Sequence, residues 1–221
     1  MNLRHRVAGV LYPRYSRLID LVNRNALVTK WYRDHAAVPR SKDRDSLYRL
    51  VSAEYIKDDA IDYLEFGVYK GSSLKKWIEL NHNPNSRFFG FDSFEGLPET
   101  WTPKLTRGAF DVGGILPQLT DDRVRLIKGW FQDTLPQFLQ TFSPRSRLVI
   151  HNDSDLYSST LYVLTMLNYL FKTKTIVIFD EFPSALHEFR AWNDYLSAYN
   201  RKATPIAITD DDSARVVFMF D

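Results

Sequence analysis

The chain of 221 residues contains no cysteine and no long apolar run. Without a thiol, disulfide scaffolds, zinc ribbons, iron–sulfur clusters and thiol nucleophiles are excluded. The longest apolar run near the start, from Val7 to Tyr12, is interrupted by Gly9 and followed by Pro13. It is too short for a signal peptide or a membrane span, so we expect a cytoplasmic protein without a membrane span.

The composition favours one folded core. Hydrophobic residues make up 44% of the chain, aromatic residues 14% and charged residues 25%, a balance that buries enough apolar surface to offset chain entropy. The length suits one sizeable domain and leaves too little chain for a second full cofactor-binding domain.

The net charge of +2 is distributed unevenly along the chain. Residues 1–44 hold ten Lys and Arg against three Asp and Glu, whereas residues 45–221 hold nineteen against twenty-four. The basic charges alternate with apolar residues, which favours an amphipathic helical arm or lid over an arm that meets phosphate or an acidic partner. The acidic balance of residues 45–221, which we expect to form the main domain, argues against nucleic acid as a partner.

Strand-like and helix-like patterns alternate from Ile61 onward, after a short helix expected over Asp45 to Ile56. This alternation predicts a mostly parallel sheet covered by helices. The expected strands are Ile61 to Gly67, Arg87 to Ser93, Val124 to Gly129, Arg147 to His151, Thr175 to Phe179, Pro205 to Thr209 and Arg215 to Phe220. The expected helices between them are Ser72 to Leu80, Thr134 to Thr141, Ser158 to Phe171 and Leu186 to Asn200.

Two connections depart from that alternation. The loop from Asp210 to Ala214 is too short for a helical crossover and predicts an antiparallel hairpin. The proline- and glycine-rich segment from Glu95 to Asp122 replaces a helix with a long loop, a common place for substrate recognition. The sequence therefore predicts a Rossmann-like α/β fold with seven strands, ending in a hairpin as in class I methyltransferases, with helices on both faces.

A glycine turn follows the first expected strand, at Gly67-x-x-x-Gly71. Glycine lets the backbone approach a ligand closely, and the N–H groups at a helix start bind carboxylate or phosphate. The spacing differs from the dinucleotide fingerprint and from the Walker loop, which disfavours NAD and ATP. The alternative is a tight turn that binds nothing.

An acid ends the second expected strand. Asp92 follows Gly67 by 25 residues, where a carboxylate can accept hydrogen bonds from both hydroxyls of a ribose. The alternative is that Asp92 caps a following helix.

Two pairs of acids follow later strands: Asp153 and Asp155, and then Asp180 and Glu181. If these strands are neighbours, about 4.8 Å apart, the acids converge on one point, and like charges resist such closeness without a cation. Oxygen ligands, with only His151 nearby as a nitrogen donor, suit Mg²⁺, Mn²⁺ or Ca²⁺ better than zinc. The alternative is that Asp155 and Asp180 are two unrelated helix caps.

Five segments in series resemble the macrocin O-methyltransferase family, whose members are S-adenosylmethionine- and Mg²⁺-dependent enzymes that methylate hydroxyls, often on sugars of natural products. The resemblance covers about residues 60–221 and is specific because order and spacing both agree. The segments are Leu64 to Ser73, Gly90 to Pro98, Lys128 to Pro136, Asp153 to Thr160 and Phe179 to Phe182.

The resemblance implies a role for each motif. Glu65, Gly67 and Gly71 would contact the methionine part of the cofactor, Asp92 the ribose, and Gly129 with Trp130 the adenine. Asp153, Asp180 and Glu181 would hold the metal, and Asp155 would be the general base. Many members have Asp-Asp where this chain has Asp180-Glu181. Further cofactor contacts are expected from Tyr69, Ser72, Ser73, Ser93 and Asp153.

The function that the sequence favours is methyl transfer to a hydroxyl of a small molecule or glycan. A carboxylate next to a bound cation can remove the hydroxyl proton, and His151 is a reserve base, although a single histidine at a strand end is more often structural. Aromatic candidates for the acceptor pocket are Trp101, Phe110, Trp130, Phe182 and Trp192, with His187 near the last helix.

Two other functions compete with methyl transfer. Asp153-Ser154-Asp155 also matches the Asp-x-Asp motif of metal-dependent glycosyltransferases. For that class of enzyme, however, we would expect no glycine turn after the first strand, and this chain has one. A non-catalytic protein that binds S-adenosylmethionine and retains the fold is the second alternative. The N-terminal arm would either close over the site or pair subunits into a homodimer or a higher homo-oligomer.

Overall fold

The computed structural model describes residues 3–211 and 214–221. The chain divides into two units: helix α1 (Leu3–Asp34) belongs to the first, and Val38 to Asp221 form the second. Four large apolar side chains of α1 are more than half exposed, namely Leu18, Leu21, Val22 and Leu27. Within the described residues, no helix has the length and apolar character needed to cross a membrane.

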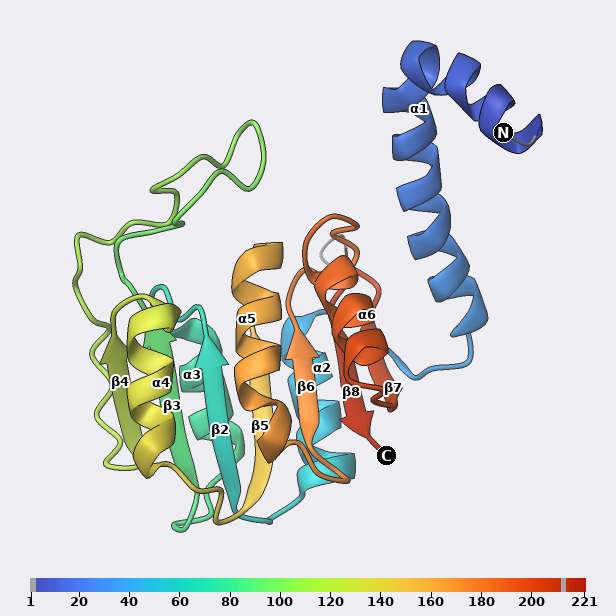
Figure 1. The fold of residues 1–221 in the computed structure, drawn as a ribbon. Helices are drawn as coiled ribbons and strands as arrows, with labels where there is room; N and C mark the ends of the chain where they lie inside the picture. Colours follow the sequence, from blue (N-terminus) through green and yellow to red (C-terminus); the bar gives the residue numbers. More distant parts are fainter. Residues whose placement is uncertain (1–2, 212–213) are drawn as a thin grey trace. The chain divides into compact units, whose positions relative to one another are not determined.

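The second unit is built on one eight-stranded sheet with the order β1-β7-β8-β6-β5-β2-β3-β4 (Figure 1). Neighbouring strands are parallel except for β8, which runs antiparallel to both β6 and β7. The predicted terminal hairpin is thereby confirmed. The strands are β1 (Arg40–Ser41), β2 (Ile61–Phe66), β3 (Arg87–Asp92), β4 (Val124–Lys128), β5 (Arg147–Asn152), β6 (Ile176–Phe179), β7 (Ala203–Thr209) and β8 (Val216–Phe220).

The prediction of seven strands was wrong by one. The additional strand is β1, which adds Arg40 and Ser41 to the edge of the sheet beside β7. Two residues are too few to show an alternating pattern, so nothing in the local sequence marks this strand.

Helices cover both faces of the sheet, as expected. In Figure 1, α4, α5 and α6 lie on the near face, and α2 and α3 lie behind it. The segment between β3 and β4 contains turns and bends but no helix, which confirms the predicted long loop. The helices are α2 (Arg44–Val51) with a π turn (Ser52–Ile56), α3 (Ser72–Leu80), α4 (Phe131–Thr141), α5 (Tyr157–Leu167) with a 3₁₀ turn (Asn168–Leu170), and α6 (Glu188–Ala198).

The central strands are apolar because both of their faces are covered. Every residue of β2 and of β6 is buried. On the α2/α3 face, Tyr48, Tyr63 and Trp77 form an aromatic cluster, whereas on the other face Phe66 stacks on Phe91 with ring centroids 4.8 Å apart. This double-sided core fixes the five parallel strands β2 to β6, and their carboxyl ends share one edge of the sheet.

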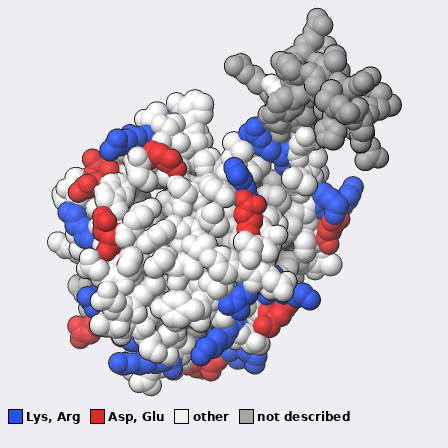
Figure 2. Space-filling view, in the orientation of Figure 1, with Lys and Arg blue, Asp and Glu red and all other residues white. Residues whose placement is uncertain are grey.

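The surface drawn in Figure 2 is mixed in charge. Basic and acidic residues are interspersed around a broad uncharged area on this face. Such mixing is typical of a solvated surface.

At the amino end of the sheet, one buried acid joins three strands. Asp62 has no exposed surface, and its carboxylate accepts hydrogen bonds from Arg87 Nε at 2.6 Å and from the backbone N–H groups of Arg145 and Ser146 at 2.6 and 2.9 Å. Arg87 begins β3, and Arg145 and Ser146 lead into β5. The carboxylate therefore holds β2 to the starts of both neighbours.

We expect Asp62→Ala to lower the free energy of unfolding by about 3 to 5 kcal/mol, because removing one partner leaves the others buried and unpaired. The matched control is Asp59→Ala. This change also breaks an ion pair, that of Asp59 with Arg147, but the Asp59 side chain is 63% exposed. That change should stay within about 1 kcal/mol. Urea unfolding measures the free energy of unfolding of both variants. Equal losses in the two would contradict the role given to Asp62.

Candidate functional site

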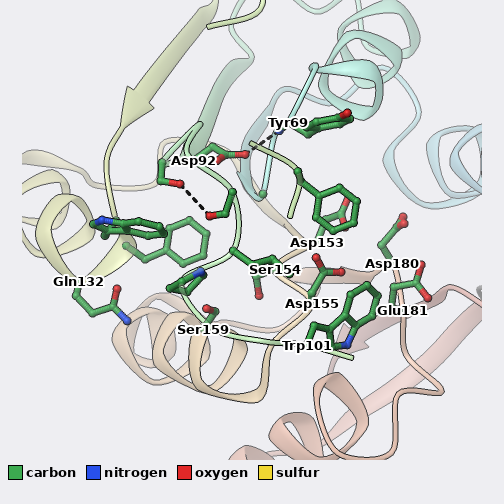
Figure 3. A pocket seen from close by; sticks show the side chains of 18 residues that line it. Tyr69, Asp92, Trp101, Gln132, Asp153, Ser154, Asp155, Ser159, Asp180 and Glu181 are labelled. Carbon is green, nitrogen blue, oxygen red and sulfur yellow. Dashed lines mark hydrogen bonds between the residues drawn. The ribbon is translucent and has the colours of Figure 1, made fainter. Parts of the chain in front are cut away.

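A cavity of about 250 Å³ opens at the carboxyl edge of the sheet. It is lined by residues that follow five strands, β2 to β6 (Figure 3). The sequence-predicted residues that line it are Gly67, Tyr69, Asp92, Ser93, Trp101, Phe110, Trp130, Asp153, Asp155, Asp180 and Glu181. Six further lining residues belong to the segments that resemble the family, but the sequence assigned them no role: Leu97, Pro98, Phe131, Gln132, Ser154 and Ser159.

The glycine turn is shaped by contact with the neighbouring loop. Gly67 has φ +94°, and a Cβ atom there would lie 1.8 Å from the carbonyl oxygen of Asp153. Only glycine fits this approach. The turn after β2 and the loop after β5 therefore touch through their backbones at the floor of the cavity.

Asp92 holds the glycine turn in place. Its Oδ2 accepts the N–H groups of Val68 and Tyr69 at 2.8 and 2.7 Å, and its Oδ1 accepts the N–H of Phe94 at 2.7 Å. A carboxylate has about four acceptor positions, so one position on Oδ1 remains. The helix-cap alternative for Asp92 is wrong, since β4 is the next element after β3 in the described chain and no helix lies between the two strands.

Several predicted cofactor residues lie outside the cavity lining. Glu65 is fully buried on the α2/α3 face, where its carboxylate accepts Ser73 Oγ and Tyr63 Oη, both at 2.6 Å. It therefore fixes the first turn of α3. Gly71 is the N-cap of that helix, with φ +77°, and Ser72 Oγ accepts from Arg44 at 3.5 Å.

Of the two residues predicted to contact the adenine, Gly129 and Trp130, only Trp130 lines the cavity. The N–H of Gly129 donates to the Asp92 carbonyl at 2.9 Å, and it is the following residue, Trp130, that reaches the cavity. The backbone of Gly129 therefore holds the end of β4 to the end of β3, while the Trp130 indole is available to a ligand.

The structure brings all four predicted carboxylates of β5 and β6 to one end of the cavity. Asp153 and Asp155 follow β5, and Asp180 and Glu181 follow β6, as the neighbouring strands require. The alternative of two helix caps is wrong, because the N-cap of α5 is Leu156 and that of α6 is His187.

The carboxylates have unequal electrostatic environments. Burial, reinforced by the charge of Asp180, raises the pKa of Asp153 well above its usual range. Burial would also raise the pKa of Asp180, but hydrogen bonds and charges from His151 and Arg215 lower it to about 2. Burial, followed by the charges of Glu181 and Asp180, raises the pKa of Asp155 to about 7.

Arg215 is a site residue that the motifs did not reveal. Its guanidinium binds both oxygens of Asp180, at 2.7 and 3.0 Å. Arg215 precedes β8, which runs antiparallel to β6 and so begins where β6 ends. The predicted hairpin was the signal that could have placed a cation here.

His151 lies behind the cavity and not in its lining. Its Nδ1 and Nε2 are 2.8 and 3.2 Å from the hydroxyls of Tyr63 and Tyr48. Burial opposes its charge, but hydrogen bonds with Asp180 and Glu65 raise the pKa of His151 to about 10. Both ring nitrogens thus face tyrosine hydroxyls outside the cavity lining, and this geometry does not support the use of His151 as a reserve base.

A buried polar network supports the loops that carry the acids. Glu188, fully buried at the start of α6, accepts Asn152 Nδ2 and the Glu181 N–H, each at 2.9 Å. Asn152 Nδ2 also donates to Thr160 Oγ1 at 3.1 Å, and Ser154 Oγ lies 3.0 Å from that hydroxyl. The network joins the ends of β5 and β6 to the starts of α5 and α6.

The acid cluster has the donor chemistry of a hard divalent cation. In the part of the chain that the structure describes, no hydrogen bond reaches the Asp153 carboxylate, and one ligand atom each of His151, Asp153 and Asp180 lie within 4.8 Å of one another. Both ring nitrogens of His151 face tyrosine hydroxyls, so the oxygen ligands of this group are Asp153 and Asp180. Glu181, the third predicted ligand, lines the same cavity but is not part of this group.

Comparison with known proteins gives consistent matches. Residues 41–216 match the family model described as Macrocin-O-methyltransferase (TylF). The chain is 36% identical over 223 residues to mycinamicin III 3''-O-methyltransferase from Micromonospora griseorubida, covering 85% of this chain and 86% of the relative.

Two further matches cover most of the chain. A Streptomyces olivaceus 8-demethyl-8-(2,3-dimethoxy-alpha-L-rhamnosyl)-tetracenomycin-C 4'-O-methyltransferase is 28% identical over 220 residues, 78% of this chain and 81% of the relative. A solved calicheamicin methyltransferase shares the fold with a TM-score of 0.60 and 24% identity, over 79% of this chain and 76% of the other.

We expect Gly67→Ala to destabilise the protein by about 2 to 5 kcal/mol, because the new Cβ must displace the Asp153 carbonyl and the backbone is in the left-handed region. The control is Gly108→Ala, whose φ of +83° is similar but whose Cβ would meet nothing within 4 Å. It should cost only about 1 to 2 kcal/mol. Thermal and urea unfolding of the two variants test the contact, and equal losses would argue against it.

Proposed function

The chain belongs to the macrocin O-methyltransferase family, and from this premise we propose that it methylates a hydroxyl on the sugar of a natural product. It is an S-adenosylmethionine-dependent O-methyltransferase. The observation that carries the finer proposal is one cavity in which the glycine turn and Asp92 adjoin four carboxylates. The glycosyltransferase alternative is not favoured, since the family and the relatives above are all O-methyltransferases.

The strands β2, β3 and β4 supply the cofactor half of the cavity. The glycine turn would take the methionine part and Trp130 would pack on the adenine. The remaining acceptor position of Asp92 Oδ1 would accept a ribose hydroxyl while the other three keep the turn folded. A cofactor held by these loops would lie beside the carboxylates that follow β5 and β6, which line the same cavity.

The strands β5 and β6 supply the reacting half. Asp155 projects into the cavity from a backbone with φ +59°, a conformation that non-glycine residues adopt at a cost when the surroundings enforce it. Its carboxylate would accept the acceptor's hydroxyl proton as the oxygen forms a bond to the methyl carbon and the carbon–sulfur bond breaks. The products are the methyl ether, protonated Asp155 and neutral S-adenosylhomocysteine.

Asp153, Asp180 and Glu181 would hold a divalent cation, Mg²⁺ or a similar ion. When bound, the cation acts as a Lewis acid that lowers the pKa of the acceptor hydroxyl and fixes its orientation. Arg215 would remain on Asp180 and keep that carboxylate ionised. Orientation of the hydroxyl matters because displacement requires alignment of oxygen, methyl carbon and sulfur.

We expect methyl transfer to stop on treatment with EDTA and to return with Mg²⁺ or Mn²⁺. Glu181→Gln should raise the metal concentration for half-maximal rate at least about tenfold, because an amide oxygen carries no charge. Glu95→Gln, the same substitution outside the cavity lining, should change nothing. The assay follows labelled methyl from S-adenosylmethionine into rhamnosyl glycosides; activity that survives EDTA would remove the metal from the proposal.

We expect Asp155→Asn to lower kcat by about 10² to 10⁴, the usual contribution of a general base. The affinity for S-adenosylhomocysteine, measured by calorimetry, should change less than about twofold because the substitution keeps the shape of the side chain. Asp122→Asn is the control, because Asp122 is exposed, lies just before the start of β4 and does not line the cavity. Unchanged kcat in Asp155→Asn would require a different base.

A further inference from the structure

Trp101 lies at the reacting half of the cavity, although the loop that carries it begins at β3, in the cofactor half. The loop follows β3, yet Figure 3 shows Trp101 at the end of the cavity that holds Asp155, Asp180 and Glu181. The loop therefore crosses over the cavity, from β3 toward the helices that follow β5 and β6.

Three contacts hold the crossing segment in position. Glu99 Oε1 accepts the Ser158 hydroxyl at 2.6 Å on α5. The Trp101 ring meets His187, just before α6, edge to face with ring centroids 6.4 Å apart and an interplanar angle of 88°. The backbone N–H of Trp101 donates to the Leu105 carbonyl at 2.9 Å. These contacts come from separate parts of the chain, so the indole has a defined place.

The base of the loop is also closed by backbone pairing. Glu95 and Asp111 form an antiparallel bridge, and Leu97 exchanges hydrogen bonds with Ala109 and Gly108, each at 2.9 Å. A long loop stabilised in this way can present a side chain with little further ordering on ligand binding.

The indole and the acids make complementary demands on a ligand. The half-buried Trp101 offers a flat apolar surface, and the carboxylates beside it offer only hydrogen-bond acceptors. A pyranose meets both demands, because one face of its ring carries C–H groups and its rim carries hydroxyl donors. A phenol or catechol presents fewer hydroxyls to the same group of acids.

We propose that Trp101 forms the acceptor subsite and takes a pyranose ring, with the C–H face of the sugar on the indole and its hydroxyls toward Asp155 and Glu181. This inference rests on the proposed function, whose reacting groups it uses. It assigns recognition of the sugar to the loop after β3 and leaves the aglycone outside this contact.

The test is a titration of methyl α-L-rhamnopyranoside, followed by saturation-transfer NMR, with and without saturating S-adenosylhomocysteine. We expect saturable binding to the unmodified protein, at least tenfold weaker binding to Trp101→Ala, and recovery of most affinity in Trp101→Phe. Lys104→Ala is the matched control, since it is an exposed residue of the same loop that does not line the cavity. Catechol serves as the competing flat probe.

Calorimetry with S-adenosylhomocysteine on every variant separates this proposal from misfolding and from the proposed function. Retained cofactor affinity in Trp101→Ala with loss of the glycoside supports the subsite. No glycoside binding to the unmodified protein, equal binding to Trp101→Ala, or preferential binding of catechol would overturn it. Glycoside binding that depends on Trp101 but is accompanied by no cofactor affinity would keep the subsite and overturn methyl transfer instead.

Discussion

The free-energy cost of burying carboxylates at one edge of a sheet governs how the surroundings of the cavity are built. An ionised carboxylate taken out of water needs a partner of opposite charge or must bind a proton. Both solutions are present here. Hydrogen bonds and charges from His151 and Arg215 hold the pKa of Asp180 at about 2, whereas burial and the charge of Asp153 raise the pKa of Glu188 well above its usual range. Asp180 therefore faces the cavity with its charge already balanced, and Glu188 lies behind the cavity, where it accepts hydrogen bonds from Asn152 and Glu181.

The two halves of the cavity are mechanically joined. The N–H of Asp153 donates to Phe66 O at 2.9 Å, and Gly67 packs on the Asp153 carbonyl. Asp92, one strand further along, holds the same turn through two N–H groups. A shift of the glycine turn would thus move the loop that carries Asp153, which ties cofactor position to the position of the reacting groups.

Much of this arrangement could be predicted from local sequence, and the exceptions share a cause. Apolar runs followed by acids placed Asp153, Asp155, Asp180 and Glu181 at one edge, because parallel strands end together. The direction of Glu65 could not be inferred, since every residue of β2 is buried and no alternation distinguishes its two faces.

Other exceptions depend on partners distant in sequence. His151 is held by a hydroxyl from α2, 103 residues away, and Arg215 reaches Asp180 only because β8 lies beside β6. In each case the residue type was visible in the sequence, but the neighbour that defines its role was supplied by the topology. Strand β1 also depends on a partner distant in sequence, because its two residues pair with β7 near the end of the chain.

The long loop after β3 completes the connection between recognition and chemistry. Ser158, which anchors the loop through Glu99, lies in the first turn of α5, three residues after Asp155. Because the same helix start positions both the loop and the acid, a change in one is transmitted to the other over a few bonds. In-line methyl transfer tolerates little misalignment of the reacting atoms. A shared anchor for Trp101 and Asp155 would therefore help to keep the acceptor oxygen, the base and the cofactor methyl aligned.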